Sequence, residues 1–401
     1  MPGPLAGTLV LDLSRVLAGP WASQALADQG ARVIKVERPG SGDDTRSWGP
    51  PYLESGDSRE SAYFLAANRG KESVAIDFKD PRGQAILLKL AREADILIEN
   101  YKVGGLAAYG LDYDSVASVN PAIVYCSISG FGQTGPYANK PGYDFMIQAM
   151  SGLMSVTGTQ EPTKVGVAVS DLIAGLYATV GILGALTRAR ETGQGEHVDI
   201  SLLDAQMAAL ANQASNYLVS GKSPGLSGNA HPNIVPYQVF ATADDPIVVA
   251  VGNDGQFVSL CKAIGREDLS SDKRFASNPA RVVNREELVP LIASEFARLP
   301  AAYWLAEFEG HGIPVAPVNS IGEAFNDPHV LETASVLQLQ RTDLGPVPGV
   351  RSPVRFRNQT AEPACAPPAL GGSTRAVLGE IGISDAEIAT LLSEGVVAEA
   401  E

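Results

Sequence analysis

The sequence has 401 residues, 45% of them hydrophobic and 19% charged, which is the composition of a globular protein long enough for two domains. Its formal net charge of −15 argues against nucleic acid as a partner, because phosphate binding needs a basic surface. The cysteines Cys126, Cys261 and Cys365 lie far apart, so the sequence predicts neither a disulfide framework nor a zinc site, and we expect no metal.

The first residues contain no basic segment followed by an apolar one, so we expect no signal peptide and a cytoplasmic protein. One long uncharged stretch, residues 172–187, is shorter than the roughly 20 residues that cross a bilayer. It contains three glycines and favours a buried helix. We therefore expect no membrane partner.

The first half of the chain alternates short apolar runs with helical patterns, which is typical of a parallel α/β sheet covered on both faces. The expected strands are 9–13, 31–36, 96–98, 122–127 and 197–201. The expected helices are 20–29, 82–94, 143–153, 171–190 and 203–218.

The pattern changes near Ser220. Residues 221–233 are rich in Gly, Pro, Ser and Asn and predict a linker, and a smaller α+β domain follows as far as about residue 320. Its expected strands are 237–241, 247–251 and 313–318. The prolines between Pro346 and Pro368 predict a chain that runs over a surface, before a last helix at 384–394.

Two motifs resemble nucleotide-binding loops. Residues 130–135 read GFGQTG after a predicted strand, but no helix is expected before Tyr143, and no acidic residue ends a next strand. An NAD(P)-dependent oxidoreductase is therefore a weak alternative. Gly221-Lys-Ser lacks the earlier glycine of a phosphate loop, where the chain has Asn216, so nothing indicates ATP.

Asp171 stands at the start of an apolar helix and, taken alone, is typical of a helix cap. Its context resembles the class III coenzyme A (CoA) transferases of the CaiB/BaiF type over almost the whole chain. The segments that carry the resemblance, in order, are LDLSRVLAGP (11–20), VIKVERPGSGD (33–43), NRGK (68–71), EN (99–100), VSD (169–171) and RETGQGEHVD (190–199).

The resemblance implies that Asp171 is a catalytic nucleophile. It would attack the donor acyl-CoA to give a mixed anhydride and then an aspartyl-CoA thioester, from which an acceptor acid takes CoA. CoA is then a substrate, no cofactor is permanently bound, and no ATP is needed. We expect the helix N-terminus to keep the Asp171 carboxyl ionised.

The resemblance also implies a CoA site at the carboxyl edge of the sheet. Its expected residues are Val16, Arg38, Asn68, Lys71, Asn100, Tyr101, Lys102 and Lys140. Formyl-CoA transferases carry an arginine where this chain has Ala108, and Lys102 is the candidate that replaces it.

A racemase acting on 2-methylacyl-CoA is the main alternative, because the same fold hosts such enzymes. They resemble this chain but carry histidine in a Gly-His-Asp triplet, where this chain has Gly142-Tyr143-Asp144. The tyrosine pKa is too high for an easy base at neutral pH. Tyr143 is therefore predicted as a catalytic residue of a transferase.

The segments 125–136, 142–144, 151–154 and 233–238 look most like the dicarboxylate-handling branch of the family, the succinate–hydroxymethylglutarate CoA-transferases. This resemblance implies that the donor is a thioester such as succinyl-CoA and that the acceptor is a small carboxylic acid. Arg15 and Arg46 are the candidate cations for a second carboxylate, and residues 225–231 are a candidate lid.

The resemblance further implies a Rossmann-like large domain formed by both chain ends, with residues 1–220 and 321–401, and a smaller α+β domain in 221–320. It implies an interlocked, ring-like homodimer.

Overall fold

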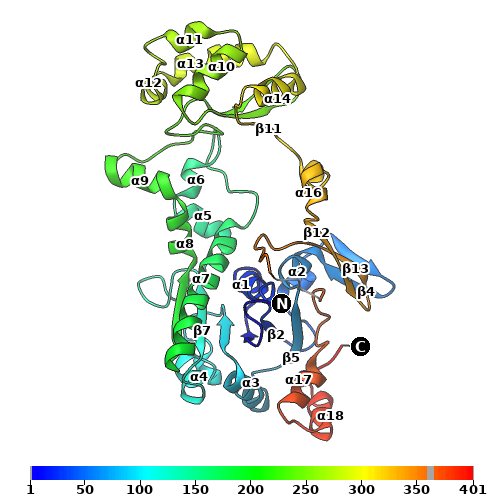
Figure 1. Ribbon diagram of the computed structural model, residues 1–401. Coiled ribbons are helices and arrows are strands. Elements are labelled where there is room, and N and C mark those ends of the chain that lie inside the picture. Colours follow the sequence, from blue (N-terminus) through cyan, green and yellow to red (C-terminus); the bar gives the residue numbers. More distant parts are fainter. Residues whose placement is uncertain (1, 359–364, 401) are drawn as a thin grey trace. The chain divides into compact units, whose positions relative to one another are not determined.

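The computed structural model describes residues 2–358 and 365–400, so Pro363 of the predicted surface segment lies outside the described residues. The chain divides into two compact units (Figure 1). The larger contains residues up to 153, 165–221 and the stretch from 333 onward, and the smaller contains 154–164 and 222–332.

The larger unit contains a seven-stranded sheet in the order β14-β5-β2-β1-β6-β7-β8, in which only β14 runs antiparallel. The strands are β1 (Leu9–Asp12), β2 (Arg32–Glu37), β5 (Lys71–Ile76), β6 (Ile96–Glu99), β7 (Val124–Ser129), β8 (Glu196–Ser201) and β14 (Val397–Ala398). The predicted α/β class with a parallel central sheet is confirmed.

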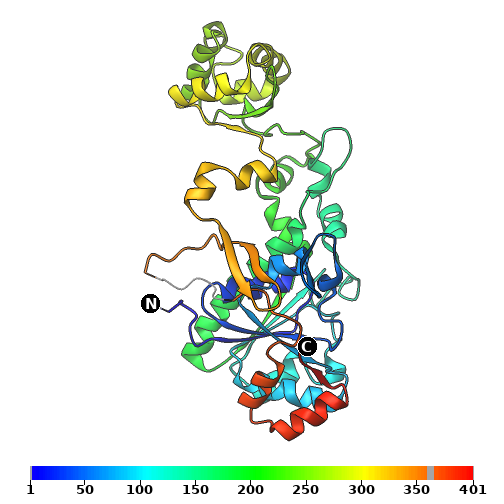
Figure 2. The ribbon, with the colours of Figure 1, turned by 90° about the vertical axis from the view of Figure 1, so that its right-hand side faces the viewer.

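Successive side chains of each strand enter two different cores, as the period of a strand requires. Leu11 and Ile34 pack with α3 (Pro81–Glu93), α4 (Tyr113–Val119), α17 (Thr374–Glu380) and α18 (Asp385–Ser393). Val10 and Val33 pack with α1 (Ala18–Ala27) and α7 (Val169–Thr192). Figures 1 and 2 show α3, α17 and α18 together beneath the sheet. Both faces are therefore covered, which explains the continuous apolar runs.

Helix α7 is long and apolar enough to cross a membrane, but the core helix of a globular unit meets the same criterion. It packs on α1, α8 (Leu202–Ala209) and the strands β7 and β8. Gly175 makes the approach to α1 possible, since a Cβ there would lie 2.7 Å from the carbonyl oxygen of Ala18. The start of α7 is thereby fixed against the start of α1.

Three expectations for the larger unit were wrong in detail. The helix expected at 203–218 is α8 and α9 (Ala211–Ser220), because Ala211 has a φ of +46° and interrupts it. The helix expected at 143–153 is α5 (Asp144–Met150) followed by α6 (Leu153–Val156). Pro346 and Pro348 lie in a hairpin of β12 (Val336–Arg341) and β13 (Gly345–Val350), where a two-stranded ribbon tolerates proline.

The smaller unit has a three-stranded antiparallel sheet, β11-β10-β9, packed against helices. The aromatic side chains of Phe257, Phe296 and Phe308 fill its core. Its elements are β9 (Tyr237–Phe240), β10 (Ile247–Ala250), α10 (Asp254–Ala263), α11 (Glu267–Ser271), α12 (Asn278–Val283), α13 (Arg285–Phe296), α14 (Ala301–Gly310), β11 (Val315–Pro317), α15 (Ile321–Phe325) and α16 (Pro328–Glu332).

The remaining elements of the larger unit are short. They are η1 (Asp44–Ser47), β3 (Tyr52–Ser55), β4 (Ser58–Ser61), α2 (Ala62–Ala67) and η2 (Ala107–Tyr109).

Candidate active site

A cavity of about 750 Å³ lies in the larger unit at the carboxyl ends of β1, β2, β5, β6 and β7. Parallel α/β sheets bind ligands at this edge, because the strands end there and the connecting loops diverge. Most of the predicted site residues line this cavity, namely Val16, Arg38, Asn100, Tyr101, Lys102, Lys140, Tyr143 and Asp171. Asn68 and Lys71 do not line it.

Asp171 lies in the first turn of α7, and polar side chains of α5, α7 and α8 hold that turn in place. Asp144, at the start of α5, accepts the backbone N–H of Ser170 at 2.8 Å and the side-chain amide of Gln148 at 2.8 Å. The hydroxyl of Ser170 donates to Gln206 of α8 at 2.9 Å. The backbone next to Asp171 is thus tied to two other helices, which gives its carboxyl a defined position in the cavity wall.

The charge state of Asp171 differs from our expectation. Burial, with a smaller contribution from the negative charge of Asp144, raises the pKa of Asp171 to about 7. The N-terminus of α7 does not compensate for these two contributions. With this pKa a large part of the carboxyl is protonated near pH 7, so the prediction that the helix keeps it ionised was wrong, because desolvation outweighs the helix dipole.

A pH profile follows from this pKa. If the carboxylate is the nucleophile, kcat/KM rises with pH through about 7 and levels above it, since this parameter reports ionisations of the free enzyme. Asp144→Asn removes the neighbouring negative charge, so the acid limb should move to lower pH. Asp204→Asn, a first-turn aspartate of α8 outside this cavity, is the control and should leave the limb in place. An unmoved limb in Asp144→Asn would contradict the assignment.

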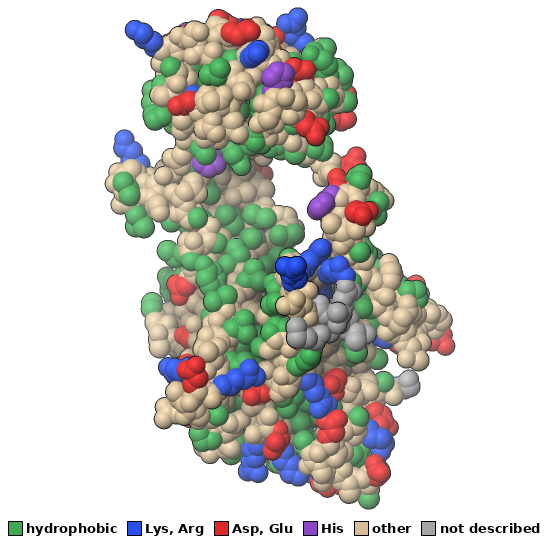
Figure 3. Space-filling model, viewed as in Figure 1, with side chains coloured by type: hydrophobic (Ala, Val, Ile, Leu, Met, Phe, Trp, Pro, Cys, Tyr) green, Lys and Arg blue, Asp and Glu red, His purple; other side chains and the backbone are tan. Residues whose placement is uncertain are grey.

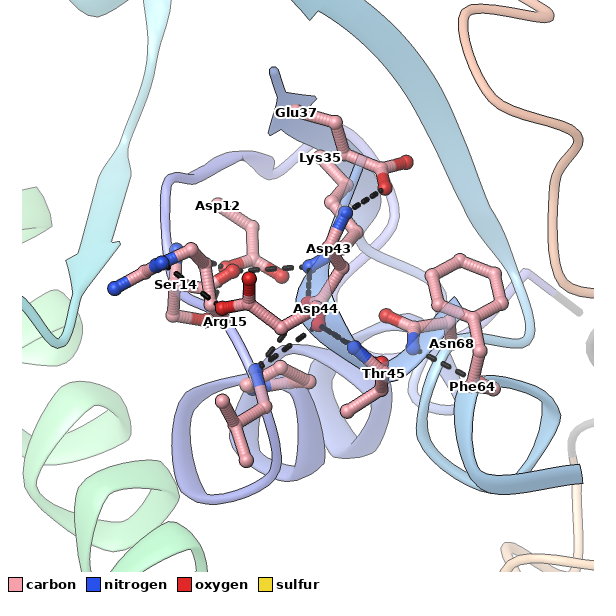
Figure 4. A network of polar contacts seen from close by, with 12 residues as sticks. Asp12, Ser14, Arg15, Lys35, Glu37, Asp43, Asp44, Thr45, Phe64 and Asn68 are labelled. Carbon is pink, nitrogen blue, oxygen red and sulfur yellow. Dashed lines mark hydrogen bonds and ion pairs between the residues drawn. The ribbon is translucent and has the colours of Figure 1, made fainter. Parts of the chain in front are cut away.

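The loop after β1 is held in a strained conformation beside the cavity. Val16 has a φ of +69°, a region that β-branched residues rarely adopt. The Asp43 carboxylate compensates by accepting the N–H of Val16 at 3.2 and 3.3 Å, and it pairs with the ammonium of buried Lys35 at 2.9 Å (Figure 4). Burial opposes the charge on Asp43, but the charge of Lys35 and the hydrogen bonds from Thr45 and Lys35 together lower the pKa of Asp43 to about 2. Asp43 is therefore a permanent anchor for this loop.

Asn100 uses its side chain on the protein itself. Its amide accepts the N–H of Arg15 at 2.8 Å and donates to the Arg15 carbonyl at 2.6 Å. The neighbouring Tyr101 N–H donates to the carboxyl of Glu99 at 2.7 Å, and burial raises the pKa of Glu99 to about 7. The Glu-Asn pair therefore shapes two walls of the cavity, the loops after β1 and β6.

The resemblance implied Lys71 and Asn68 as residues of the CoA site, but neither lines the cavity. Lys71 is fully buried, pairs with Asp12 at 3.2 Å and donates to Asn68 at 2.8 Å and to the Pro20 carbonyl at 3.0 Å. Asn68 is buried and donates to the Phe64 carbonyl at the end of α2 at 2.9 Å. Both side chains are satisfied within the protein and have no group free for CoA.

Arg46 also lies outside the cavity. It pairs with Glu37 at 2.7 Å and Glu60 at 2.6 Å, and its guanidinium stacks on the ring of Phe64 at 3.6 Å. A guanidinium with two carboxylates has no free donor edge for a substrate. The suggestion that Arg46 reads a second carboxylate is therefore not supported by its position.

Besides the buried Lys35, which pairs with Asp43, the cations at the cavity wall are Arg15, Arg38, Lys79, Lys102 and Lys140. Lys140 lies over the ring of Tyr137 at 3.7 Å. Lys79 was missed, although it follows β5 at the same sheet edge, because strand β5 was not predicted. Ala108 is exposed and outside the cavity wall, whereas Lys102 is part of it, as a replacement for the family arginine requires.

Tyr143 is exposed at the cavity and precedes α5. Its position depends on a glycine pair, since a Cβ on Gly130 would lie 2.5 Å from the Cα of Gly142. The loop 130–135 contains no helix start, and its first glycine serves this close backbone contact. Within the described residues, no group of three His, Cys, Asp or Glu side chains could hold a metal ion.

The cavity thus brings the carboxyl of Asp171 and a group of cations together at the sheet edge, and comparisons with known proteins identify the family of the chain. The family model for CoA-transferase family III matches residues 5–374, so the chain belongs to this family and is an enzyme of CoA transfer. It is 48% identical over 382 residues to the "succinate–glutarate CoA-transferase" of Agrobacterium fabrum, covering 94% of this chain and 96% of that protein. The human "succinyl-CoA:glutarate CoA-transferase" is 43% identical over 401 residues, covering 99% and 91%.

Among solved structures, a CaiB/BaiF family protein from Brucella suis is similar, with a TM-score of 0.85 and 45% identity. The match covers 95% of this chain and all of that one.

Proposed function

We propose that this enzyme transfers CoA from a dicarboxylyl-CoA such as succinyl-CoA to a small carboxylic acid through covalent intermediates on Asp171. The main observation that supports this proposal is that the carboxyl of Asp171 shares one cavity with the cations Arg38, Lys79, Lys102 and Lys140. CoA brings several phosphate charges, which this net-acidic protein can meet only with such a local group. The names of the relatives support dicarboxylates as substrates.

The proposed reaction has two symmetrical halves. A carboxylate oxygen of Asp171 attacks the thioester carbonyl, and the C–S bond breaks to leave a mixed anhydride and CoA thiolate. The thiolate attacks the Asp171 carbonyl, and the donor acid leaves with the bridging oxygen. The acceptor carboxylate then attacks the aspartyl-CoA thioester, and the released thiolate takes the acceptor acyl group from the new anhydride. One thioester replaces another, so no other energy source is needed.

A racemase is the second candidate, because Asp171 with a raised pKa could also exchange a proton. It needs a second base across the substrate carbon; Tyr143 lines the same cavity, and no histidine of the described part of the chain does. Incubation of 2-methylacyl-CoA in D₂O without an acceptor acid separates the two. Deuterium at Cα would favour the racemase, and its absence favours transfer.

We also propose a cytoplasmic homodimer, interlocked as in the family, with the larger domain formed by both chain ends. Large apolar side chains lie exposed on α5, α7 and α9 of the larger unit, and Figure 3 shows hydrophobic side chains gathered there. They include Phe145, Leu176, Val180, Leu218 and Val219. A patch of this kind supports a protein interface. Light scattering should give twice the chain mass of 41.9 kDa, and a monomer would contradict the proposal.

The experiment that tests the transfer itself is a donor–acceptor screen. Succinyl-CoA is incubated with a panel of monocarboxylates and dicarboxylates, and the thioester products are read by mass. New thioesters formed without ATP support the proposal. Hydrolysis to free CoA with every acid would contradict it.

A further inference from the structure

Arg15 stands at a fixed place in the wall of the cavity that contains Asp171. Asn100 binds both its backbone N–H and its carbonyl, and Asp43 fixes the next residue, Val16, in its left-handed conformation. Strained backbone persists only where its surroundings enforce it, and such sites are commonly functional. Two polar side chains from the loops after β2 and β6, Asp43 and Asn100, thus hold the backbone that carries this cationic side chain.

The guanidinium of Arg15 is incompletely satisfied. One Nη pairs with Asp44 at 2.9 Å, in a pair whose side chains are 34% and 47% exposed, so water weakens it. Nε is buried, and no acceptor among the described residues reaches it. The guanidinium also lies 5.0 Å from the ring centre of Tyr101. A buried N–H without an acceptor is destabilising, and a ligand oxygen at that edge would relieve the cost.

The charge around Arg15 suits a carboxylate better than a phosphate. The carboxylate of Asp44 lies next to it, and its repulsion costs a phosphate dianion more than a singly charged carboxylate. For Arg38, Lys79 and Lys102 no ion pair is found within residues 2–358 and 365–400, so these cations keep their full charge for the phosphates of CoA. The planar fork of an arginine matches the two oxygens of a carboxylate.

We propose that Arg15 binds the second carboxylate of the dicarboxylate, whether this is the free acid or the acyl part of the thioester. Arg15 is then the residue that selects diacids over monoacids of the same length. The inference rests on the proposed transfer function and names the group that sets its acid specificity. Arg46, the other candidate, is saturated by Glu37 and Glu60.

The test compares Arg15→Met with wild type at a saturating thioester donor. We expect the KM for glutarate or succinate to rise about 10- to 100-fold, the loss typical of one charge-assisted contact. The Kd for free CoA, measured by calorimetry, should stay within about twofold, because CoA has no carboxylate. Arg38→Met is the matched control and should weaken CoA instead. Arg15→Lys keeps the charge without the fork and should fall between Arg15→Met and wild type.

Two results would overturn the assignment: an unchanged KM for the diacid in folded Arg15→Met, or a loss of CoA affinity as large as the loss for the diacid. Asp44→Asn gives a check in the opposite direction, because it frees the Nη of Arg15. A KM for the diacid at or below the wild-type value supports the proposal, and a rise to the Arg15→Met value refutes it. Wild-type turnover with diacids tests the transfer function separately.

Discussion

Replacing Asp171 with alanine is expected to lower kcat for CoA transfer by about 10³-fold or more, while CoA still binds. Loss of a covalent nucleophile removes the intermediates themselves, and such losses cost orders of magnitude. The cations of the cavity wall are unchanged in this variant, so CoA affinity by calorimetry should remain within a few-fold. Asp204→Ala is the matched control, since Asp204 also stands in the first turn of a helix, α8, but lies outside the cavity.

Residual turnover within about tenfold of wild type would refute the role of Asp171 as nucleophile. An isotope experiment gives independent evidence. Because the bridging oxygen of the anhydride stays with Asp171 when the acceptor acid is activated, ¹⁸O-labelled acceptor acid should leave ¹⁸O in the Asp171 carboxyl. Peptide mass spectrometry reads this label. Turnover that leaves no ¹⁸O on the Asp171 peptide would mean that CoA passes from the donor to the acceptor acid without a covalent intermediate on Asp171.

The position of the site could be predicted from sequence, since it depends on local order along the chain. Apolar runs with helices between them predict a parallel sheet, and Asn100 follows a strand, so it had to lie at the carboxyl edge. The start of α7 at Asp171 was expected within two residues of its observed start at Val169. These features depend on periodicity and neighbours, which a sequence displays directly.

The roles of individual charges could not be predicted in the same way. Arg38 and Arg46 stand eight positions apart in one segment, yet Arg38 lines the cavity and Arg46 is saturated by carboxylates. The difference depends on Glu60, which comes from a later hairpin strand, β4. The pKa of Asp171 depends on burial and on Asp144, which is distant in sequence. Burial and long-range partners therefore decide what a charged residue does.

Replacing Lys71 is expected to have a large effect on the stability of the protein. Lys71→Met should lower the free energy of unfolding by about 3–5 kcal/mol. The buried carboxylate of Asp12 would lose one of the two cations, Lys71 and Lys35, that stabilise its charge. Asp12 is fully buried and also accepts the hydroxyls of Ser14 and Ser23, so it cannot turn to water. Burial lowers the pKa of Lys71 to about 8, so the pair is charged at neutral pH.

Urea titration at pH 7 measures this loss of stability. Lys89→Met is the matched control, because Lys89 is exposed on α3. This control should change the free energy of unfolding by no more than about 0.5 kcal/mol. The folded Lys71→Met protein, assayed well below its urea midpoint, should bind CoA as wild type does, because Lys71 does not line the cavity. The opposite pattern, normal stability with a large loss of CoA affinity, would show that Lys71 belongs to the CoA site, as the resemblance implies. The same cation would then contact phosphate after a rearrangement of its pair with Asp12, so the two measurements together decide between a structural and a ligand-binding lysine.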